Sequence, residues 1–407
     1  MNVVLFEDDY FADLLPLVYF RPVWELRCGA LTLAEKIARY VSPKEPLRFL
    51  ARTYLQQNYI PEERHLDSPP EETIFVNGAV LARPELKTAL QNLEEGQCLI
   101  AGERLVAFRD RRGADSYRNA DGVVMTDRVR DSLTSQSIDI PIIRYIWDAI
   151  DWMEEELQRD FQFRPQQSSG KIYDGVHLLE REQICVADGA VIKPGVVLDA
   201  EAGPIWIDEG AEVMPNSVII GPAFIGKCSR IKVGAKIYGP VCIGPVCKIG
   251  GEVEGSTILG YSNKQHDGFL GHAYLGSWVN LGADTNNSDL KNNYGRIRVF
   301  LNGREIDTGK QFLGLIMGDH SKTAINTMFN TGTIVGVNCN IFGAEMPPKF
   351  VPSFSWGGAT KWVDYDLQKA IQVAKIVMGR RNVTFGEREE RLFRAVHALA
   401  RKIERRG

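Results

Sequence analysis

The chain has 407 residues, enough for two or three domains, and its 44% hydrophobic and 25% charged residues are typical of a globular protein. A net charge of -4 gives no reason to expect nucleic acid or an anionic membrane as a partner. No apolar stretch is long enough to span a bilayer, and the first nine residues lack the basic start of a signal peptide, so we expect a cytoplasmic protein.

Seven cysteines are scattered along the chain without a Cys-x-x-Cys pair. An odd, scattered set predicts reduced thiols, in keeping with a cytoplasmic protein. Cys228, Cys242 and Cys247 lie within the repeat described below, where we expect small buried side chains and no zinc site.

The first 163 residues predict an α/β domain. Short strands are expected at residues 3–6, 73–76 and 98–101, and a Glu-rich helix at 146–161. A further helix over residues 31–40 begins with Thr32 and Glu35, the spacing of a capping box. Residues 164–175 begin with a polar Pro-Gln-Gln-Ser-Ser-Gly stretch, which favours a linker.

Residues 176–345 repeat with a period of six. Helices place apolar residues three to four apart and half-buried strands two apart, so this period fits neither. It is typical of the hexapeptide β-helix, in which each hexad forms one short strand and one turn with a single aliphatic side chain inside. The longest uninterrupted run of aliphatic positions is Ile207, Val213, Ile219, Ile225, Ile231, Ile237, Ile243 and Ile249.

Interruptions divide the repeat into sections. Insertions in a solenoid project as loops and often build its functional site. An earlier set of hexads ends three residues out of step with Ile207, a further insertion follows Ile249, and residues 286–315 predict a protruding loop. The inward positions expected outside the long run are Val186, Ile192, Leu198, Phe269, Leu275, Leu281, Met317, Thr323, Phe329, Val335 and Ile341.

Residues 346–407 follow the repeat and predict two helices, at 364–381 and 384–405. The basic end of the second helix is favourable with the helix dipole, so we interpret it as a solvated terminus.

The polar residues that suggest chemistry crowd into residues 262–285. Lys264, His266, His272 and Asn280 occupy little more than one coil, where mainly aliphatic and small residues are expected. Acyl transfer from a thioester to an amine needs a base that works at neutral pH, and a histidine suits this role. Asparagine side chains suit the binding of the amine or of a developing oxyanion.

The pattern that begins at His266 and runs through Leu275-Gly276 to Val279-Asn280-Leu281-Gly282-Ala283 closely resembles the acetyltransferase domain of the bifunctional GlmU enzymes. The resemblance implies that His266 is the general base that deprotonates the amine of glucosamine 1-phosphate, that Asn280 holds the sugar and that Ala283 contacts acetyl-CoA. It also implies a left-handed coil and a homotrimer with the site between subunits. Gly318-Asp319-His320 is similar to the family's return to the coil.

The sequence departs from the GlmU pattern in places. Phe269 stands where the family commonly has Tyr, and the family's Asn-Tyr pair falls on Asp289-Leu290 without a gap. With a five-residue insertion the pair becomes Asn293-Tyr294, which we favour as substrate contacts because the chemistry is kept.

Two alternatives remain open for the charged and histidine side chains of this part of the chain. Lys264 is either a solvated corner charge or a point charge that binds the sugar phosphate. His266, His272 and His320 could instead be three zinc ligands, although their spacing departs from that of β-helical zinc enzymes.

The first domain resembles the nucleotidyltransferase domain of GlmU only loosely. There a Gly-rich loop after the first strand cradles the nucleoside triphosphate, whereas here Glu7-Asp8-Asp9 follows, and the metal-binding Asp falls on Asn77.

Two interpretations of this domain stay open. In the first it is a divergent but active enzyme, in which Arg21 and Arg27 bind UTP or another nucleoside triphosphate and Asp8 and Asp9 hold Mg²⁺. In the second it serves packing or regulation, and both arginines pair with neighbouring acids.

The sequence thus predicts an α/β nucleotidyltransferase-like domain (1–163), a linker (164–175), a left-handed parallel β-helix of hexapeptide repeats (176–345) and a C-terminal helical segment (346–407). The expected function is acetylation of glucosamine 1-phosphate from acetyl-CoA, with uridylylation of N-acetylglucosamine 1-phosphate to UDP-N-acetylglucosamine as a second activity. One alternative is a sugar-1-phosphate nucleotidyltransferase whose β-helix serves only for oligomerisation. Another is a non-enzymatic assembly protein.

Overall fold

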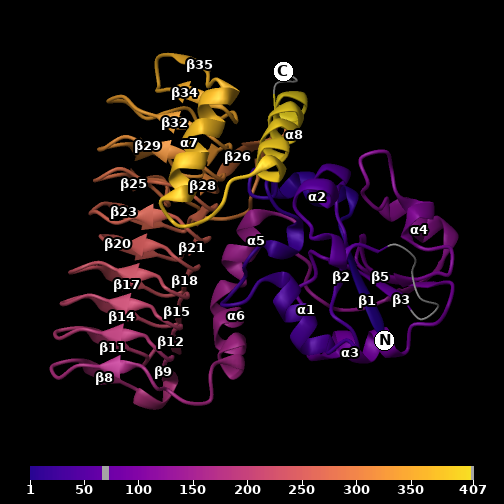
Figure 1. Cartoon of the computed structure of the whole chain (residues 1–407), viewed down its shortest axis with the longest axis horizontal. Helices are drawn as coiled ribbons and strands as arrows, with labels where there is room; N and C mark the ends of the chain where they lie inside the picture. The colour runs from indigo at the N-terminus through magenta and orange to yellow at the C-terminus, as the bar shows by residue number, and fades with distance from the viewer. Residues whose placement is uncertain (67–72, 405–407) are drawn as a thin grey trace. The chain divides into compact units, whose positions relative to one another are not determined.

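The computed structural model describes residues 1–66 and 73–404, which form two compact units (Figure 1). The first unit comprises residues 1–26, 31–145 and 386–396, and the second comprises residues 27–30, 146–385 and the rest of the described chain. The structure therefore groups the Glu-rich segment 146–163 with the second unit. Each unit has its own hydrophobic core.

The first unit is built on a six-stranded mixed sheet. Its strand order is β2-β1-β3-β5-β4-β6, with β1 parallel to both neighbours and β5 antiparallel to both of its neighbours. The three predicted strands are confirmed as β1, β3 and β4. The strand bounds are β1 Asn2–Phe6, β2 Arg48–Leu50, β3 Thr73–Asn77, β4 Gln97–Ala101, β5 Arg104–Arg109 and β6 Thr134–Ser137.

Helices and short 3-10 turns join these strands. The capping box predicted for the first helix is confirmed, because the Thr32 side chain accepts from the Glu35 N–H and the Glu35 carboxylate accepts from the Thr32 N–H. The helices are α1 Leu33–Val41, α2 Thr53–Asn58, α3 Pro84–Gln91 and α4 Thr126–Ser132. The 3-10 turns are η1 Asp9–Leu14, η2 Val23–Glu25, η3 Glu62–Arg64 and η4 Ala114–Tyr117.

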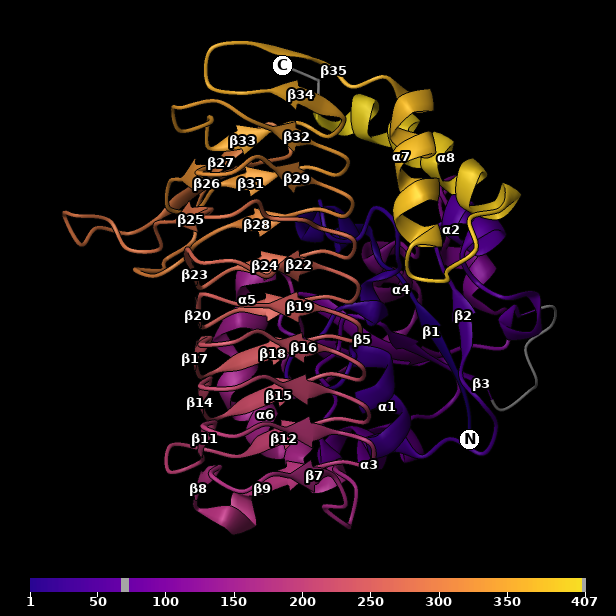
Figure 2. The same ribbon diagram turned by 60° about the vertical axis from the view of Figure 1, so that its left-hand side comes forward.

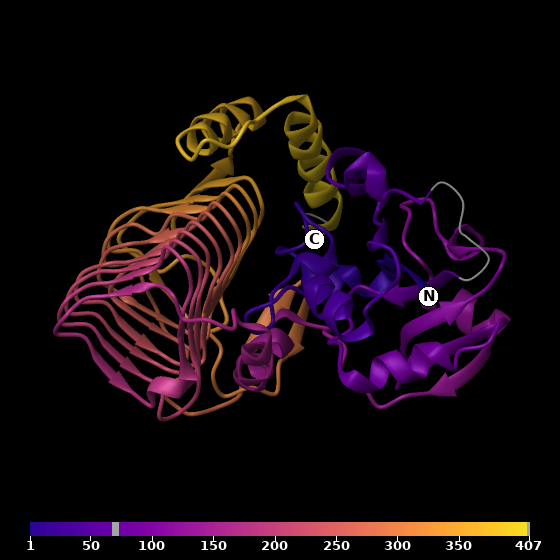
Figure 3. The same cartoon turned by 60° about the horizontal axis from the view of Figure 1, so that its bottom comes forward.

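The second unit is a parallel β-helix, and the hexapeptide-repeat fold expected from the sequence is confirmed. Its coils lie one over another in Figure 3, and each coil contributes one short strand to each of three sheets. The first sheet contains β7 Lys171–Ile172, β10 Val191–Ile192, β13 Glu212–Val213, β16 Arg230–Ile231, β19 Lys248–Ile249 and β22 Asn263–Lys264. The second contains β8 His177–Leu179, β11 Val197–Asp199, β14 Val218–Ile220, β17 Lys236–Tyr238, β20 Glu252–Glu254 and β23 Phe269–Gly271.

The third sheet is the longest and continues into the last coils. It contains β9 Ile184–Val186, β12 Ile205–Ile207, β15 Ala223–Ile225, β18 Val241–Ile243, β21 Thr257–Ile258, β24 Tyr274–Leu275, β28 Ile316–Met317, β31 Ile334–Val335 and β33 Phe350–Val351. The first sheet resumes beyond β22 through bridges at Asn280. Its later strands are β29 Lys322–Thr323, β32 Asn340–Ile341, β34 Ser355–Gly357 and the antiparallel β35 Trp362–Asp364.

The period of six sets the core of the β-helix. All eight aliphatic positions of the long run are fully buried, as predicted. The expectation for the following section was wrong, because Leu270 rather than Phe269 points inward. The coil shortens after Ile249: Val253 and Ile258 follow at four and five residues, so Lys264 takes the next inward position beside Ile249.

Residues 286–315 leave the coil as an excursion, as predicted (Figure 2). The excursion is partly ordered, since it holds the hairpin of β26 Arg298–Leu301 and β27 Arg304–Asp307. It starts at β25 Asn286–Asn287, which pairs with β30 Met328–Phe329.

Helices also belong to the second unit. The predicted Glu-rich helix is split into α5 Ile146–Asp151, α6 Met153–Asp160 and the turn η5 Phe161–Phe163, and its apolar face packs on Trp206 and Phe224 of the third sheet. The two predicted C-terminal helices are confirmed as α7 Leu367–Gly379, which belongs to this unit, and α8 Glu387–Glu404, whose part up to residue 396 belongs to the first unit. A further turn, η6 Arg181–Gln183, lies in the first coil.

All seven cysteines are free thiols, as predicted. Cys242 and Cys247 are buried, but Cys228 is exposed because it lies at an outward corner, so the expectation of a buried side chain there was wrong. Within the described residues, no helix is both long and apolar enough to cross a membrane.

Candidate functional site

A column of polar side chains runs along the outside of the first sheet. Lys248 pairs in register with Asn263, which bridges to Asn280, and Asn280 bridges in turn to Lys322. These residues hold equivalent outward positions on four successive coils, since each precedes an inward residue. Side chains at such positions stand one above another, so the column presents two amides between two amines.

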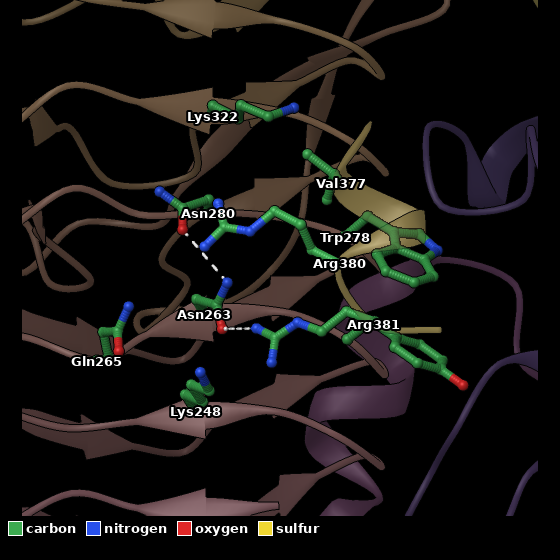
Figure 4. A pocket seen from close by; sticks show the side chains of 10 residues that line it. Lys248, Asn263, Gln265, Trp278, Asn280, Lys322, Val377, Arg380 and Arg381 are labelled. Atoms are coloured by element: carbon green, nitrogen blue, oxygen red, sulfur yellow. Dashed lines mark hydrogen bonds between the residues drawn. The ribbon is translucent and has the colours of Figure 1, made fainter. Parts of the chain in front are cut away.

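The C-terminal end of α7 faces this column and encloses a cavity of about 380 Å³ (Figure 4). Arg380 and Arg381 extend from the helix toward the two asparagines. Among the described residues, those that line the cavity include no carboxylate. We call this cavity the basic pocket, lined by Lys248, Tyr261, Asn263, Gln265, Trp278, Asn280, Lys322, Val377, Arg380 and Arg381.

Hydrogen bonds fix the orientation of the pocket amides. The Arg381 guanidinium donates to the Asn263 side-chain oxygen at 2.8 Å, and the Asn263 amide nitrogen donates to the Asn280 oxygen at 3.3 Å. Because the Asn280 oxygen is taken up in this chain, its NH₂ group is the part left to donate to a ligand. Asn280, predicted as a substrate contact, therefore lies in a pocket equipped with donors.

One wall of the pocket is aromatic. The rings of Tyr261 and Trp278 stack with centroids 4.2 Å apart and planes 13° apart, and the Trp278 ring also lies parallel to that of His320 at 6.0 Å. All three residues turn the same corner of successive coils with positive φ of 61° to 65°. Rings stacked in this way cover each other's faces and form an apolar wall beside the cations.

Burial lowers the pKa of both pocket lysines. Burial lowers the pKa of Lys322 to about 8, although its ammonium group donates to the His320 carbonyl at 2.8 Å. Burial also lowers the pKa of Lys248, and the nearby guanidinium groups of Arg381 and Arg230 add to that effect. Both shifts mean that a negative charge in the pocket would stabilise the charged amines.

His266, the predicted base, lies in the exposed corner that follows β22, directly after the pocket residue Gln265. Lys264 fixes the backbone at this corner, because its buried ammonium group donates to the carbonyls of Gly250 and His266 at 3.0 Å each. Burial lowers the pKa of Lys264 to about 8. Lys264 is thus neither a solvated corner charge nor exposed to a phosphate, contrary to both expectations for it.

His272 is the histidine whose surroundings sequence reasoning missed. Its Nδ1 lies 2.8 Å from a carboxylate oxygen of Asp289, and its ring lies 5.1 Å from that of Phe312. Asp289 and Phe312 both belong to the excursion, so this pair fastens the excursion to the coil. A His followed by an Asp at this spacing carries no sequence signal, because the contact depends on the path of the excursion.

The remaining predicted contacts of the β-helix lie away from the basic pocket. Asn293 and Tyr294 are exposed on the excursion, where Asn293 borders a separate cavity of about 650 Å³ with Lys291 and Lys349. Ala283 lies in the corner one coil beyond His266, and its carbonyl accepts from the Asn326 N–H. One subunit therefore does not bring Asn293 and Asn280 into the same pocket.

In the first unit, the acids that follow β1 are matched by arginines. Glu7 is fully buried and receives Nε and a terminal nitrogen of Arg52 at 3.0 Å each. Asp8 accepts from Arg104 at 3.1 Å and from the Asn77 amide at 2.7 Å. Burial raises the pKa of Asp8 despite these partners, and Asp9 accepts from the Thr126 N–H.

These contacts do not fit a divalent cation at Asp8 and Asp9, because the Arg104 guanidinium already lies against the Asp8 carboxylate. Among the described residues, no group of three or more His, Cys, Asp or Glu side chains could hold a metal ion, which also leaves the zinc alternative for the histidines without support.

The two predicted nucleotide-binding arginines fall in different units. Arg21 is buried in the first unit, and its carbonyl accepts from Arg52. Arg27 belongs to the second, where its guanidinium donates to the Ala30 carbonyl and lies over the Phe224 ring.

The basic pocket as a whole was not predicted. Its sequence signal is weak, since Lys248 and Lys322 occupy ordinary outward hexad positions and Arg380-Arg381 is the basic end of a helix. Only the fold brings these residues together.

Parts of the chain are similar to known sugar-phosphate transferases. Residues 3–169 match the family described as sugar nucleotidyl transferase, so the chain joins a domain of that family to a hexapeptide-repeat β-helix. Over part of its length the chain is similar to bifunctional sugar-phosphate transferases of the GlmU type.

The relatives match at low identity. Bifunctional protein GlmU of Methanococcus maripaludis is 31% identical over 44% of this chain and 38% of its own length, and GlmU of Synechococcus elongatus is 27% identical over 44% and 40%. A bifunctional sugar-1-phosphate nucleotidylyltransferase/acetyltransferase of Sulfurisphaera tokodaii is 26% identical over 34% and 35%. The chain thus spans about 40% or less of these relatives. Among solved structures, a UDP-N-acetylglucosamine acyltransferase of Francisella novicida aligns with a TM-score of 0.35 at 16% identity, covering 54% of this chain and 74% of that one.

Proposed function

We propose that the protein is an N-acetyltransferase of the GlmU type that transfers the acetyl group of acetyl-CoA to the amine of glucosamine 1-phosphate. The observation that carries this proposal is the pairing of an exposed histidine, His266, with a neighbouring pocket that contains Asn280, four cations and no carboxylate among its lining residues. A phosphorylated substrate matches such a pocket, and the free imidazole beside it suits proton abstraction from an amine.

In the proposed reaction His266 takes a proton from the ammonium form of the sugar amine. The nitrogen lone pair attacks the thioester carbonyl carbon, and the resulting oxyanion collapses with cleavage of the C–S bond. The thiolate of CoA leaves and is protonated. Lys264 acts as a positioning residue, because its two hydrogen bonds hold the corner that carries His266. Asn280 orients the substrate through its NH₂ group.

A homotrimer is part of this proposal. The corners that follow strands of the first sheet expose Val233, Ile325 and Phe342 by 57%, 66% and 44%, on the same edge as His266. Exposed apolar side chains along one edge are expected to bury against another copy. In a trimer, the excursion residues Asn293 and Tyr294 of a neighbouring copy could reach the substrate. Light scattering of the purified chain tests this, with a monomer as the contradicting result.

The direct test is CoA release from acetyl-CoA with and without glucosamine 1-phosphate, for the wild type, His266→Ala and His177→Ala. We expect sugar-dependent release that falls by 10²–10⁴ in His266→Ala, the usual contribution of a general base. The matched control His177→Ala, an exposed histidine of the first coil, should stay within about twofold of the wild type. Equal losses in both variants would sink the assignment of His266.

Nucleotidyl transfer is the second candidate, favoured by the family match of residues 3–169. In that case UTP and N-acetylglucosamine 1-phosphate release pyrophosphate, and the β-helix serves only for assembly. Pyrophosphate release without any CoA release would support it over acetyl transfer. The arginine partners of Glu7 and Asp8 argue for acetyl transfer as the main activity.

A further inference from the structure

One edge of the sheet in the first unit carries an arginine where the resemblance to GlmU enzymes implies a divalent cation. In open α/β sheets, ligands bind at the carboxyl ends of parallel strands. The parallel strands β1 and β3 end at this edge, and the antiparallel β5 begins there and brings Arg104 to Asp8. We propose that the Arg104 guanidinium is a built-in cation that takes the place of the metal ion, so that the first unit neither binds a divalent cation at Asp8 nor performs metal-dependent nucleotidyl transfer.

Both oxygens of the Asp8 carboxylate already have partners within the protein. One oxygen accepts from the Tyr10 N–H at 3.1 Å, and the other accepts from Arg104 at 3.1 Å and from the Asn77 amide at 2.7 Å. The residue as a whole is only 3% exposed. A Mg²⁺ ion demands a near-octahedral set of oxygen ligands and usually keeps several waters. A carboxylate that is buried and bonded on both oxygens does not offer that coordination.

The Asn77 side chain is oriented to donate a hydrogen bond to Asp8. Its nitrogen donates to Asp8 and to the Leu105 carbonyl, and its oxygen accepts from the Ala79 N–H at 2.9 Å. The opposite orientation would set two oxygens 2.7 Å apart, so the hydrogen bonds fix the amide. An N–H group repels a cation, whereas an aspartate at this position would leave two carboxylates side by side that need one.

Packing holds Arg104 in this place. Its side chain is 8% exposed, and its guanidinium lies 4.3 Å from the centroid of the Tyr10 ring. A guanidinium binds a carboxylate and an aromatic face at the same time, and it stays charged at any working pH. A divalent ion on the same Asp8 oxygen would lie close to this fixed positive charge, and such repulsion is strong in a buried site.

An arginine in the metal position removes metal-dependent chemistry from the first unit and leaves its fold intact. Residues 3–169 match the sugar nucleotidyl transferase family, although the cation at this edge belongs to the protein itself. His266 and Asn280 lie in the second unit. Acetyl transfer and the built-in cation can therefore each be present or absent without the other, and tests of the two give separate answers.

Electron paramagnetic resonance of free Mn²⁺ in titrations with the full chain measures cation binding without turnover. The wild type and Asp8→Asn should bind Mn²⁺ equally weakly. The double variant Asn77→Asp/Arg104→Ala removes the guanidinium and sets a second carboxylate beside Asp8. It should bind Mn²⁺ at least about tenfold more tightly than the wild type, because affinity rises with the number of charged ligands. Mn²⁺ should also raise the Tm of this variant more than that of the wild type.

Arg109→Ala is the matched control, because Arg109 lies at the other end of β5 and pairs with the exposed Glu95. It also frees a carboxylate, and it should leave Mn²⁺ binding at the wild-type level. If the double variant does not fold, Arg104→Gln should show the gain instead, since its amide can still donate to Asp8. Wild-type Mn²⁺ binding that Asp8→Asn abolishes, or no gain in any folded variant that lacks Arg104, overturns the inference. Pyrophosphate release from UTP, Mg²⁺ and a sugar 1-phosphate that Asp8→Asn abolishes would also overturn it.

Discussion

The charged residues that follow β1 in the first unit and those of the basic pocket in the second unit have opposite environments. Glu7 and Asp8 each meet an arginine within 3.1 Å and are almost completely buried. The four pocket cations instead face amides, aromatic rings and a cavity. The first region is internally neutralised, whereas the second has an unbalanced positive charge.

This difference separates structural charge from charge that is ready for a ligand. A buried ion pair with complete hydrogen bonding gains little from a further ligand, and breaking it leaves an uncompensated charge. An unbalanced cluster beside a cavity gains stability when an anion enters. The contrast predicts that substitutions in the first region act on folding and that substitutions in the second act on binding.

The largest effect is expected from Arg52→Met. This change leaves the buried Glu7 carboxylate without its partner, so the first unit should lose about 3–5 kcal/mol of stability. Chemical denaturation followed by circular dichroism measures the loss. The double variant Glu7→Gln/Arg52→Met should recover a large part of it, and a loss below about 1 kcal/mol in the single variant would contradict the structural role.

Asn280→Ala should affect substrate use rather than folding. The side chain donates from the outside of the coil, so we expect kcat/KM for the sugar phosphate to fall about tenfold, the value of one good hydrogen bond to a charged group. Steady-state CoA release measures this. Asn292→Ala, an exposed asparagine of the excursion, is the matched control and should stay within twofold of the wild type. An unchanged Asn280→Ala enzyme would remove this residue from the site.

Sugar-phosphate affinity should depend on pH through Lys322. Its amine is charged below about pH 8 and neutral above it, and an anion binds the charged form better. The affinity should therefore be level between pH 7 and 8, where the phosphate is already a dianion, and fall as the pH rises further. In Lys322→Met the affinity is lower throughout and this fall is lost. A wild-type affinity that stays constant from pH 7 to 9.5 would show that Lys322 does not contact the ligand.

Lys264→Met is expected to change the way in which the stability of the protein depends on pH. The folded pKa of about 8 lies below the value near 10.4 of a solvated lysine, so the unfolded chain binds more protons between these pH values. Wild-type stability should therefore rise as the pH increases from 8 toward 10. In Lys264→Met that rise should shrink, as thermal unfolding at pH 7 and 9.5 would show. An unchanged pH dependence would place the wild-type amine outside the core.

The inward aliphatic column could be predicted from sequence because one side chain per hexad has to fill the coil. The position of Lys264 could not, since two short steps within one coil, after Ile249, moved the register, and the expected period placed Phe269 inside instead of Leu270. The partner of Glu7 could not be predicted either, because Arg52 follows the neighbouring strand β2 and lies 45 residues further along the chain. The prediction of Asn280 rested on the local pattern around His266, whereas the pocket around it depends on α7 folding back over the column.

Hydrogen–deuterium exchange of the full chain, with and without UTP and Mg²⁺ and with and without glucosamine 1-phosphate, tests the contrast between the two regions most directly. We predict that the sugar phosphate slows exchange in segments 246–282 and 377–382, and that residues 7–9 and 52–54 exchange at the same rate under every condition. Protection of residues 7–9 by UTP and Mg²⁺, with none around the basic pocket, would contradict this prediction and move the ligand chemistry to the first unit.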